Sequence, residues 1–230
     1  MKRMDVYDTP FYSKNFYDHK ARWIHYFHQI RAVAGEIRRR GRGLNGFLVL
    51  EIGPSHGLVT EYLRKFGVSV TTLDYKESYK PDVVGDVRAL PFADDSFDMA
   101  ICCEVLEHMP FGDSLIALRE LRRVSRGAVL MSVPDARRTL LGLQIKIPFF
   151  RPLSLMIRVP AFVRQVVVNE HWHNWEIGKI GYPTSRVRGE IERVGFRIRQ
   201  YGSLPDTPRN YYFLLEKIKV ISAKRNQNRS

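Results

Sequence analysis

The sequence predicts an α/β protein built on a doubly wound, mostly parallel β-sheet. Between residues 47 and 134, short β-rich runs alternate with segments of helical periodicity, which is the pattern of parallel strands joined by right-handed crossovers. Near the end of the chain, two β-rich runs are separated only by a short turn, as in adjacent antiparallel strands. A glycine turn at 53–57 follows the first strand directly, at the sheet edge where α/β proteins bind ligands.

One amphipathic helix is predicted before the first strand. From Phe16 onward, apolar residues recur at intervals of three and four, and the glycines of segment 41–46 end the pattern. Such a stripe packs against a core in most proteins. The residues expected on the buried face are Trp23, Phe27, Ile30, Ala34 and Ile37.

The elements of the predicted sheet follow in regular order. Helices are expected at 58–66, where Gly67 ends the pattern, and at 114–124, where Asp113 is the expected cap. The β-rich runs predict strands at 47–52, 68–74, 82–84, 97–105 and 127–133.

The alternation stops at residues 135–182, where proline, arginine and aromatic residues mix without a clear period. After this insert, residues 184–196 predict a helix with Thr184 at its cap. Strands at 197–204 and 211–218 complete the sheet, and the residues between them favour a turn.

The composition is that of a globular protein, with 44% hydrophobic and 27% charged residues. Charges and prolines interrupt the apolar stretch 139–168, so no membrane span is predicted. No apolar run follows the first charged residues, and we therefore expect no secretory signal and a cytoplasmic location. The neighbouring Cys102 and Cys103 are expected to be buried strand residues rather than a disulfide.

The net charge of +13 leaves two interpretations open. The arginines of segment 38–42 and the basic residues from Lys217 onward are either solvated chain ends or contacts to an anionic partner. Nucleic acid and an anionic membrane surface are the partners that such charge favours.

The residues around the glycine turn predict a nucleoside site. Gly53 and Gly57 permit a sharp backbone turn and a close approach of the ligand. Asp74 ends the second predicted strand, a position from which a carboxylate reaches both ribose hydroxyls of an adenosine. The turn lacks the three glycines of the dinucleotide fingerprint, and Glu51 suits a cationic ligand such as a sulfonium.

At this point the sequence resembles a known family. The segments VLEIGPSHG, VTTLDYKE, GDVRALPFADDSFDMAICCEVLEHM and LRELRRVSRGAVLMSVP are similar to class I S-adenosylmethionine-dependent methyltransferases, in particular the small-molecule branch called type 11. The resemblance covers about residues 47–134. It implies a Rossmann-like sheet of seven strands with an antiparallel last strand, together with an N-terminal helix and a lid-like insert.

The resemblance also implies a single methyltransferase domain over residues 1–230. Its expected parts are an N-terminal helical segment (1–43), a cofactor-binding core (44–134), a substrate-lid insert (135–182), a final helix and strand pair (183–217) and a basic tail (218–230).

The implied cofactor is S-adenosylmethionine. The resemblance places the first strand end and the glycine turn around the methionine portion, with Asp74 on the ribose and Asp86 beside the adenine. Ser55 stands where the family has its middle glycine. The family also places its N-terminal segment over the cofactor, so the first helix is either a lid or a core element. The expected cofactor-binding residues are Glu51, Gly53, Pro54, Gly57, Asp74, Tyr75, Asp86, Val87 and Glu104.

Methyl transfer requires the acceptor to be held in line with the methyl carbon, and an oxygen acceptor gains from a general base. His108 and His171 are the candidates for this base, although a structural hydrogen bond is the alternative role for each. His171-x-His173 is reminiscent of a metal site, but no third ligand stands at a recognisable spacing, so no metal is predicted. The residues expected to line the acceptor pocket are His171, His173, Trp175 and Glu176.

The expected acceptor is a small molecule or a lipid-linked compound, such as one with a saccharide hydroxyl. The alternatives are an RNA methyltransferase and a non-catalytic protein that retains the fold. Segment 145–168 either lies on an anionic bilayer, with its arginines at the headgroups, or packs its apolar residues against the sheet. The apolar residues concerned are Phe149, Phe150, Leu155 and Phe162.

Overall fold

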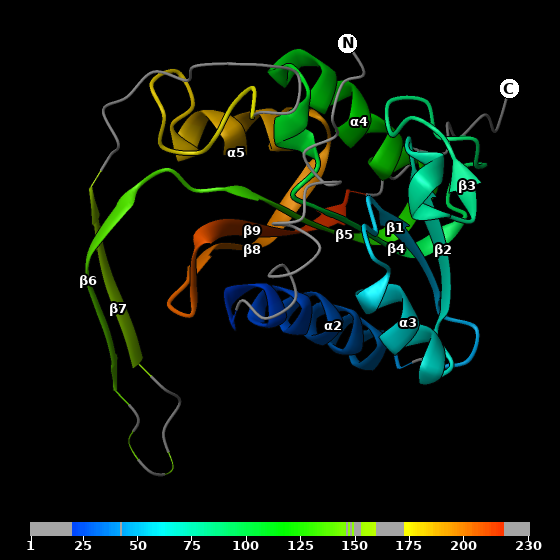
Figure 1. The fold of residues 1–230 in the computed structure, drawn as a ribbon, viewed down its shortest axis with the longest axis horizontal. Coiled ribbons are helices and arrows are strands. Elements are labelled where there is room, and N and C mark those ends of the chain that lie inside the picture. The colour runs from blue at the N-terminus through cyan, green and yellow to red at the C-terminus, as the bar shows by residue number, and fades with distance from the viewer. Residues whose placement is uncertain are drawn as a thin grey trace, which may run out of the picture.

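The computed structural model describes residues 20–41, 43–145, 147, 149, 153–159 and 173–218. Within this part of the chain lies a seven-stranded sheet in the order β3-β2-β1-β4-β5-β9-β8 (Figure 1). Its strands are β1 (Leu48–Ile52), β2 (Ser69–Asp74), β3 (Val83–Val84), β4 (Phe97–Cys103), β5 (Ser125–Pro134), β8 (Phe196–Leu204) and β9 (Thr207–Lys217).

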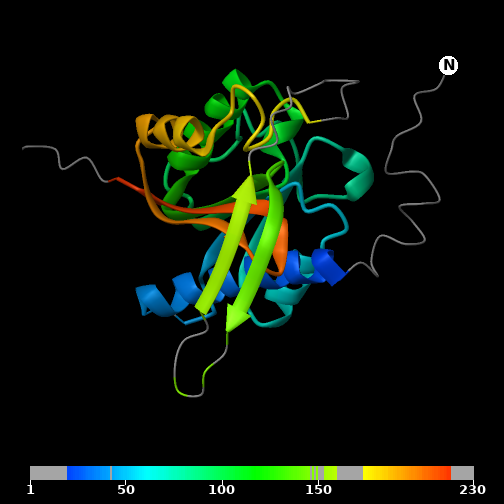
Figure 2. The same ribbon diagram turned by 90° about the vertical axis from the view of Figure 1, so that its left-hand side faces the viewer.

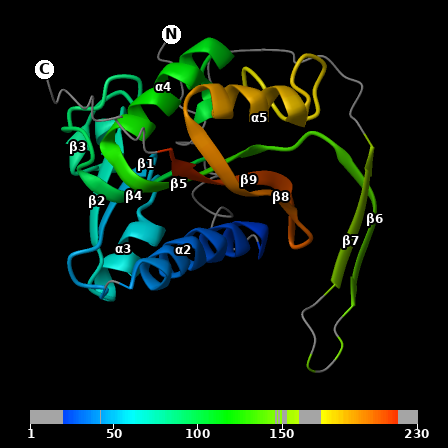
Figure 3. The ribbon, with the colours of Figure 1, turned by 180° about the vertical axis from the view of Figure 1, so that it is seen from behind.

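The predicted fold class is confirmed. Strands β1 to β5 pair in parallel, whereas β9, the last strand in the sequence, runs antiparallel to both β5 and β8. Helices cover both faces: α2 and α3 lie on one face, and α4 and α5 on the other (Figure 3). These helices are α2 (Lys20–Arg40), α3 (Leu58–Lys65), α4 (Phe111–Val124) and α5 (Thr184–Arg193).

The sheet has a hydrophobic core on each face because its central strands alternate their side chains. In β1, Leu50 and Ile52 join the larger cluster with residues of α4 and α5. Val49 points the other way, into the cluster with residues of α2 and α3. The carboxyl end of β1 is therefore held rigidly from both sides, which places the following turn.

The buried face of α2 differs from the predicted one. Trp23 and Phe27, expected in the core, are about half exposed, whereas Tyr26 and Val33 are buried. Glu36 is also buried, and its carboxylate bonds to arginines of its own helix and to Arg199 of β8, at 2.7 Å. These charge-assisted bonds allow a polar residue on the buried face, which apolar periodicity does not detect.

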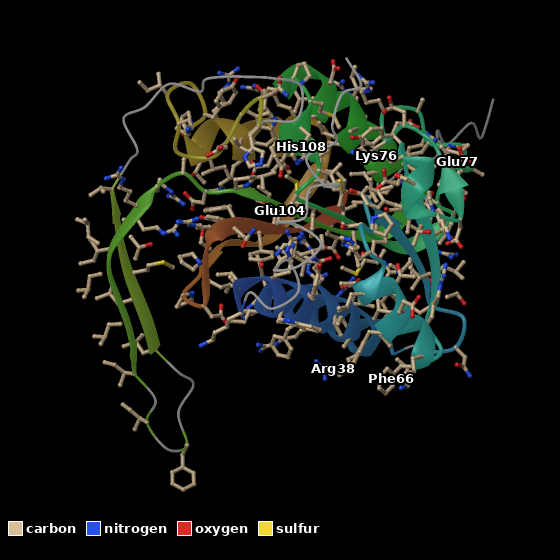
Figure 4. The ribbon with its side chains drawn as sticks, in the orientation of Figure 1. Arg38, Phe66, Lys76, Glu77, Glu104 and His108 are labelled. Atoms are coloured by element: carbon tan, nitrogen blue, oxygen red, sulfur yellow. The ribbon has the colours of Figure 1, made fainter. Side chains whose placement is uncertain are left out.

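Part of the basic cluster at the end of α2 is used internally. Arg39 pairs with Glu36 at 2.6 Å, and Arg40 pairs with the fully buried Asp98 at 3.2 Å. Arg38 is exposed and points away from the sheet (Figure 4). The solvated-end interpretation therefore does not describe Arg39 and Arg40, which join α2 to the sheet.

Two predicted helix caps are wrong. Pro110 is the N-cap residue of α4, and Asp113 lies in the first turn, where it pairs with Arg88 at 2.6 Å. Pro183 is the N-cap residue of α5, and Thr184 is its first helical residue. Proline is well suited to a helix start because its missing N–H has no partner to lose there. The turn between β8 and β9 is also shorter than predicted, because β9 begins at Thr207.

The insert contains regular structure that the sequence pattern did not predict. Strands β6 (Arg138–Ile145) and β7 (Leu153–Val159) form a separate antiparallel pair. This hairpin stands apart from the main sheet (Figure 1), and Figure 2 shows it face on. No helix among the described residues has the length and apolar character required to cross a membrane.

The base of the hairpin is fixed by the buried carboxylate of Asp135, which follows β5. Arg158 of β7 bonds to this carboxylate and, at 2.9 Å, to Ser203 of β8. Arg137 pairs with the same carboxylate at 2.7 Å. Burial alone would raise the pKa of Asp135, but the bonds from Arg137 and Ser203 outweigh it and hold that pKa below its usual value.

Candidate active site

The glycine turn after β1 has a backbone that only glycine accommodates at its first position. Gly53 has a φ of +67°, and a Cβ there would lie 2.6 Å from Cγ2 of Val105. Its N–H donates to the carbonyl of Leu73 at 2.9 Å, which joins the turn to β2. Gly57, at the N-cap of α3, has a φ of +72°, and its N–H donates to the carbonyl of the buried Pro54. The turn is thus tight, with a bare backbone at the edge of the sheet.

Glu51 lies one residue from the end of β1, and its side chain points toward the α3 face. It is 4% exposed and accepts a hydrogen bond from the hydroxyl of Thr60. Burial raises the pKa of Glu51 to about 7, although the Thr60 bond and the charge of Arg64 act in the opposite direction. The carboxyl thus sits between β1 and the first turn of α3, where a nearby cation would favour its ionised form.

Asp74 ends β2 beside the same turn, because β1 and β2 are parallel neighbours. The residue is 6% exposed, and one carboxylate oxygen accepts the N–H of Lys76 at 2.9 Å. Burial raises its pKa, while the Lys76 backbone and charge lower it. Tyr75 is well exposed next to it, with the Lys76 ammonium 5.6 Å from its ring centre. Lys76 and Glu77 mark this side of the site in Figure 4.

Asp86 and Val87 follow β3 and differ in burial, since Asp86 is partly exposed and Val87 is buried. The Asp86 carboxylate is half exposed and pairs with Arg88 at 2.6 Å, which bridges to Asp113 of α4. The bond from Arg88 lowers the pKa of Asp86. Val87 is buried in the core cluster of the α4 face. This turn is therefore well ordered by its own contacts.

Glu104 directly follows β4 and has an unusual backbone, with a φ of +55°. Its carboxylate accepts a hydrogen bond from the Ser132 hydroxyl of β5 at 2.7 Å. Burial raises its pKa, in spite of the Ser132 bond. Left-handed backbone at a non-glycine residue is a strained state that is common at functional sites. Figure 4 shows Glu104 and His108 near the middle of the molecule.

His108 ends the short 3₁₀ helix η3 (Leu106–His108), and segment 173–178 of the insert packs against this helix. The N–H of Asn174 donates to the Glu107 carbonyl at 2.6 Å. The Trp175 indole donates to the Leu106 carbonyl at 3.1 Å and to the Ser114 hydroxyl at 3.0 Å. These bonds bring His173 next to His108, with ring centres 5.1 Å apart.

Trp175 does not lie where the sequence analysis expected it. The side chain is 1% exposed and belongs to the core cluster of the α4 face, so it anchors the insert instead of lining an acceptor pocket. His173 and Glu176 do lie together, joined by a 2.9 Å contact between Nδ1 and the carboxylate. His171, the other expected base, is outside the described residues.

Glu107, which was not predicted from the sequence as a site residue, lies among these residues. It is fully buried, and within the described part of the chain neither of its carboxylate oxygens has a hydrogen-bond partner. Burial raises its pKa well above the usual value, and the nearby Glu104 adds to the rise. The sequence does hold one indication of its importance, because Glu107 lies three residues after Glu104 and directly before His108, which were both candidate site residues. Its significance depends on His173, which only the fold brings close.

The chain matches the family model described as "Methyltransferase domain", of the type 11 family, over residues 50–131. It is also similar to the malonyl-[acyl-carrier protein] O-methyltransferase of Erwinia pyrifoliae, with 35% identity over 120 residues. That match covers 45% of this chain and 44% of the relative, so it spans less than half of the relative's length.

Solved structures share the fold at low sequence identity. Magnesium protoporphyrin IX methyltransferase from Synechocystis PCC 6803, with S-adenosylhomocysteine bound, has a TM-score of 0.57 and 16% identity, covering 86% of each chain. The 1,6-didemethyltoxoflavin-N1-methyltransferase of Burkholderia thailandensis has a TM-score of 0.54 and 14% identity, covering 90% of this chain and 86% of that one.

The family match falls on the part of the chain that carries β1 to β5, the glycine turn, Asp74 and Glu104. The sheet order and the single antiparallel strand agree with the fold of the similar structures. Residues 50–131 therefore match the type 11 methyltransferase family, and the chain has the fold of S-adenosylmethionine-dependent methyltransferases.

Proposed function

We propose that this protein transfers a methyl group from S-adenosylmethionine to a small-molecule acceptor. The observation that carries the proposal is the meeting of three features at one edge of the sheet. These are the bare glycine turn after β1, the buried carboxylate of Asp74 after β2, and the strained Glu104 after β4. Because these strands are parallel neighbours, their carboxyl ends lie side by side.

The residues present fit this cofactor. Gly57 leaves open backbone, since the atom nearest to a Cβ there is Cγ of Glu61 at 3.9 Å, and Asp74 offers an acceptor for a pair of hydroxyls. We assign Tyr75, Asp86 and Val87 to the adenosine side, and Glu51, Pro54, Gly57 and Glu104 to the methionine side. When bound, S-adenosylmethionine supplies an electrophilic methyl group on a cationic sulfur. The role of the chain is to hold the acceptor in line with it and to exclude water.

The acceptor class is inferred from relatives and from the surroundings of Glu104. By their names, two of the similar proteins act on small molecules, magnesium protoporphyrin IX and 1,6-didemethyltoxoflavin. The third acts on malonyl-[acyl-carrier protein], whose malonyl group is carried by a protein. In this chain, His173 and Glu176 come from the insert and approach the Glu104 side of the site. We assign these two residues, with His108, to the acceptor side.

Substitution of Asp74 tests the cofactor site. Asp74→Ala removes charge-assisted hydrogen bonds to the ribose, each of which contributes about 1.5 to 3 kcal/mol. The dissociation constant for S-adenosylhomocysteine, measured by titration calorimetry, is expected to rise by at least roughly 100-fold. Asp94→Ala, at an exposed carboxylate paired with Arg123, is the matched control and should leave binding unchanged. Equal affinities in wild type and Asp74→Ala would place the cofactor elsewhere.

The hairpin favours a lipid-linked acceptor over a freely dissolved one. Its paired residues put apolar side chains on a single face, and all of them are exposed. These cross-strand pairs are Leu141 with Ile157, Leu143 with Leu155, and Ile145 with Leu153. Phe149, beyond the paired strands, is fully exposed. The predicted alternative, in which these residues pack against the main sheet, is therefore wrong for Leu155 and Phe149. Phe150 and Phe162 lie outside the described residues.

We assign this apolar face to an anionic bilayer, because arginine and lysine flank it in a chain of net charge +13. Co-sedimentation with phosphatidylglycerol vesicles at low salt should retain the wild-type protein. The double variant Leu143→Asp, Leu155→Asp should remain in the supernatant. Ile180→Asp, at an exposed residue outside the hairpin, should bind as wild type does. Wild-type protein that stays in the supernatant would reject the membrane contact.

A further inference from the structure

Glu107, His108 and His173 lie together next to the acceptor side of the site. One ligating atom from each of these residues lies within 4.8 Å of the others. Oε1 of Glu107 is 3.9 Å from Nε2 of His108 and 4.0 Å from Nε2 of His173. We propose that these three side chains bind one divalent transition-metal ion.

The buried carboxylate is the strongest reason. Glu107 is fully buried, yet neither oxygen has a hydrogen-bond partner among the described residues. A buried carboxyl without partners costs several kcal/mol, and such groups are normally paired or coordinate a metal. Two imidazoles lie within 4.0 Å of its Oε1, and an unprotonated imidazole is a neutral metal ligand.

The orientation of His173 supports the same conclusion. Its Nδ1 bonds to the Glu176 carboxylate at 2.9 Å, which directs Nε2 toward Glu107. A carboxylate on the far nitrogen is the usual partner of a metal-binding histidine, because it fixes the ring and increases its basicity. Glu176 thus acts as a positioning residue and not as a ligand.

The distances suit an ion of ordinary size. Around a tetrahedral ion with bonds of about 2.1 Å, neighbouring ligand atoms lie about 3.4 Å apart. The carboxylate–imidazole separations of 3.9 and 4.0 Å therefore need to shorten by only about 0.5 Å. Both histidines are about one-third exposed and have room to adjust.

Two imidazoles and one carboxylate leave coordination positions open, which is typical of catalytic rather than structural ions. Glu104 lies close enough to influence the charge of Glu107, so the ion would stand between the insert and the strained end of β4. A bound ion there lowers the pKa of a coordinated hydroxyl. A role of the ion in activating the acceptor hydroxyl rests on the proposed methyl transfer. The binding of the ion to Glu107, His108 and His173 does not depend on that proposal. The role assigned to His108 is then that of a ligand, in place of the general base expected from the sequence.

Cobalt binding tests the site directly. The full chain is treated with a chelator, desalted and titrated with Co²⁺, whose visible absorption reports binding, and Zn²⁺ is then added in competition. Wild type should take up one equivalent and release it to Zn²⁺. Glu107→Gln and His173→Gln should each weaken Co²⁺ binding by at least about 100-fold, and Glu176→Gln by about 10- to 100-fold.

The control variant is His28→Gln, which changes a histidine paired with Asp206 at 3.2 Å, outside this cluster. It should bind Co²⁺ as wild type does. Since Glu107 is buried, thermal unfolding must show that Glu107→Gln is folded; His173→Gln changes a partly exposed residue and provides the second test. No saturable uptake by wild type, or uptake that is unchanged in His173→Gln, would overturn the proposal. The titration contains no S-adenosylmethionine, so its outcome is independent of the cofactor test on Asp74.

Discussion

Replacing Gly53 by alanine should expose two separate physical constraints on the glycine turn. The first is the backbone, since a φ of +67° is unfavourable for any residue with a Cβ. The second is space, because the new Cβ would lie 2.6 Å from Cγ2 of Val105. Val105 packs against the core cluster of the α4 face, so it cannot move away without disturbing that core.

The expected magnitude is the sum of these effects. Left-handed backbone costs roughly 1 to 2 kcal/mol in a residue with a side chain. Forcing an extra methyl group into a packed site costs about 1 to 3 kcal/mol. Gly53→Ala should therefore lower the free energy of unfolding by about 2 to 5 kcal/mol. Val105→Ala removes the clash but not the backbone strain, so the double variant should recover about 1 to 3 kcal/mol relative to additivity.

Urea denaturation of wild type, both single variants and the double variant gives this coupling free energy. Gly57→Ala is a matched control, because its φ of +72° is similar but the nearest atom to a Cβ there is Cγ of Glu61, at 3.9 Å. Gly57→Ala should lower the free energy of unfolding only by the backbone strain, and its effect should add to that of Val105→Ala without coupling. The reasoning fails if Gly53→Ala costs no more than Gly57→Ala, or if its effect adds to that of Val105→Ala without coupling.

Two further predictions concern buried polar groups. The pKa of Glu51 is about 7 in the folded chain against an ordinary 4.5, so its stabilising contribution is complete below pH 4.5 and is lost as the pH rises through 7. Relative to Glu51→Gln, the free energy of unfolding of wild type should fall by about 3 kcal/mol between pH 4 and pH 8 in urea titrations. Trp175→Phe removes the indole bonds to Leu106 and Ser114 and should cost about 1 to 2 kcal/mol in the same assay.

Each of these has a clear contrary result. A stability difference between wild type and Glu51→Gln that stays constant with pH would show that Glu51 does not titrate in this range. Trp23→Phe, at a half-exposed position of α2, is the control for the tryptophan and should change stability by less than about 0.5 kcal/mol. An equal effect of the two substitutions would mean that the Trp175 hydrogen bonds contribute no stability.

The sheet could be predicted because its information is local. Each strand from β1 to β5 is a continuous β-rich run, and each end is marked by glycine, proline or a charged residue. Parallel order then brings successive strand ends to one edge without any knowledge of side-chain contacts. For the same reason Gly53, Asp74 and Glu104 could be selected from the sequence as site candidates, since each closely follows or ends a predicted strand.

Local patterns failed where distant residues decide the outcome. The buried face of α2 includes Glu36 because Arg199, far along the chain, bonds to it. Strands β6 and β7 alternate apolar residues with Gly142, Gln144 and Ser154, but this apolar face joins neither core cluster. The hairpin is instead held at its base, where Arg158 bonds to Asp135, a contact that the sequence pattern does not show.

The sequence by itself determined the class of fold and the strand ends that carry the proposed cofactor residues, because alternating periodicity and glycine turns act over a few neighbouring residues. Only the tertiary structure decided that Trp175 is an anchor and that Glu107 is left buried beside His108 and His173. Such groupings depend on how the insert folds back over η3, through hydrogen bonds between segments far apart in the chain.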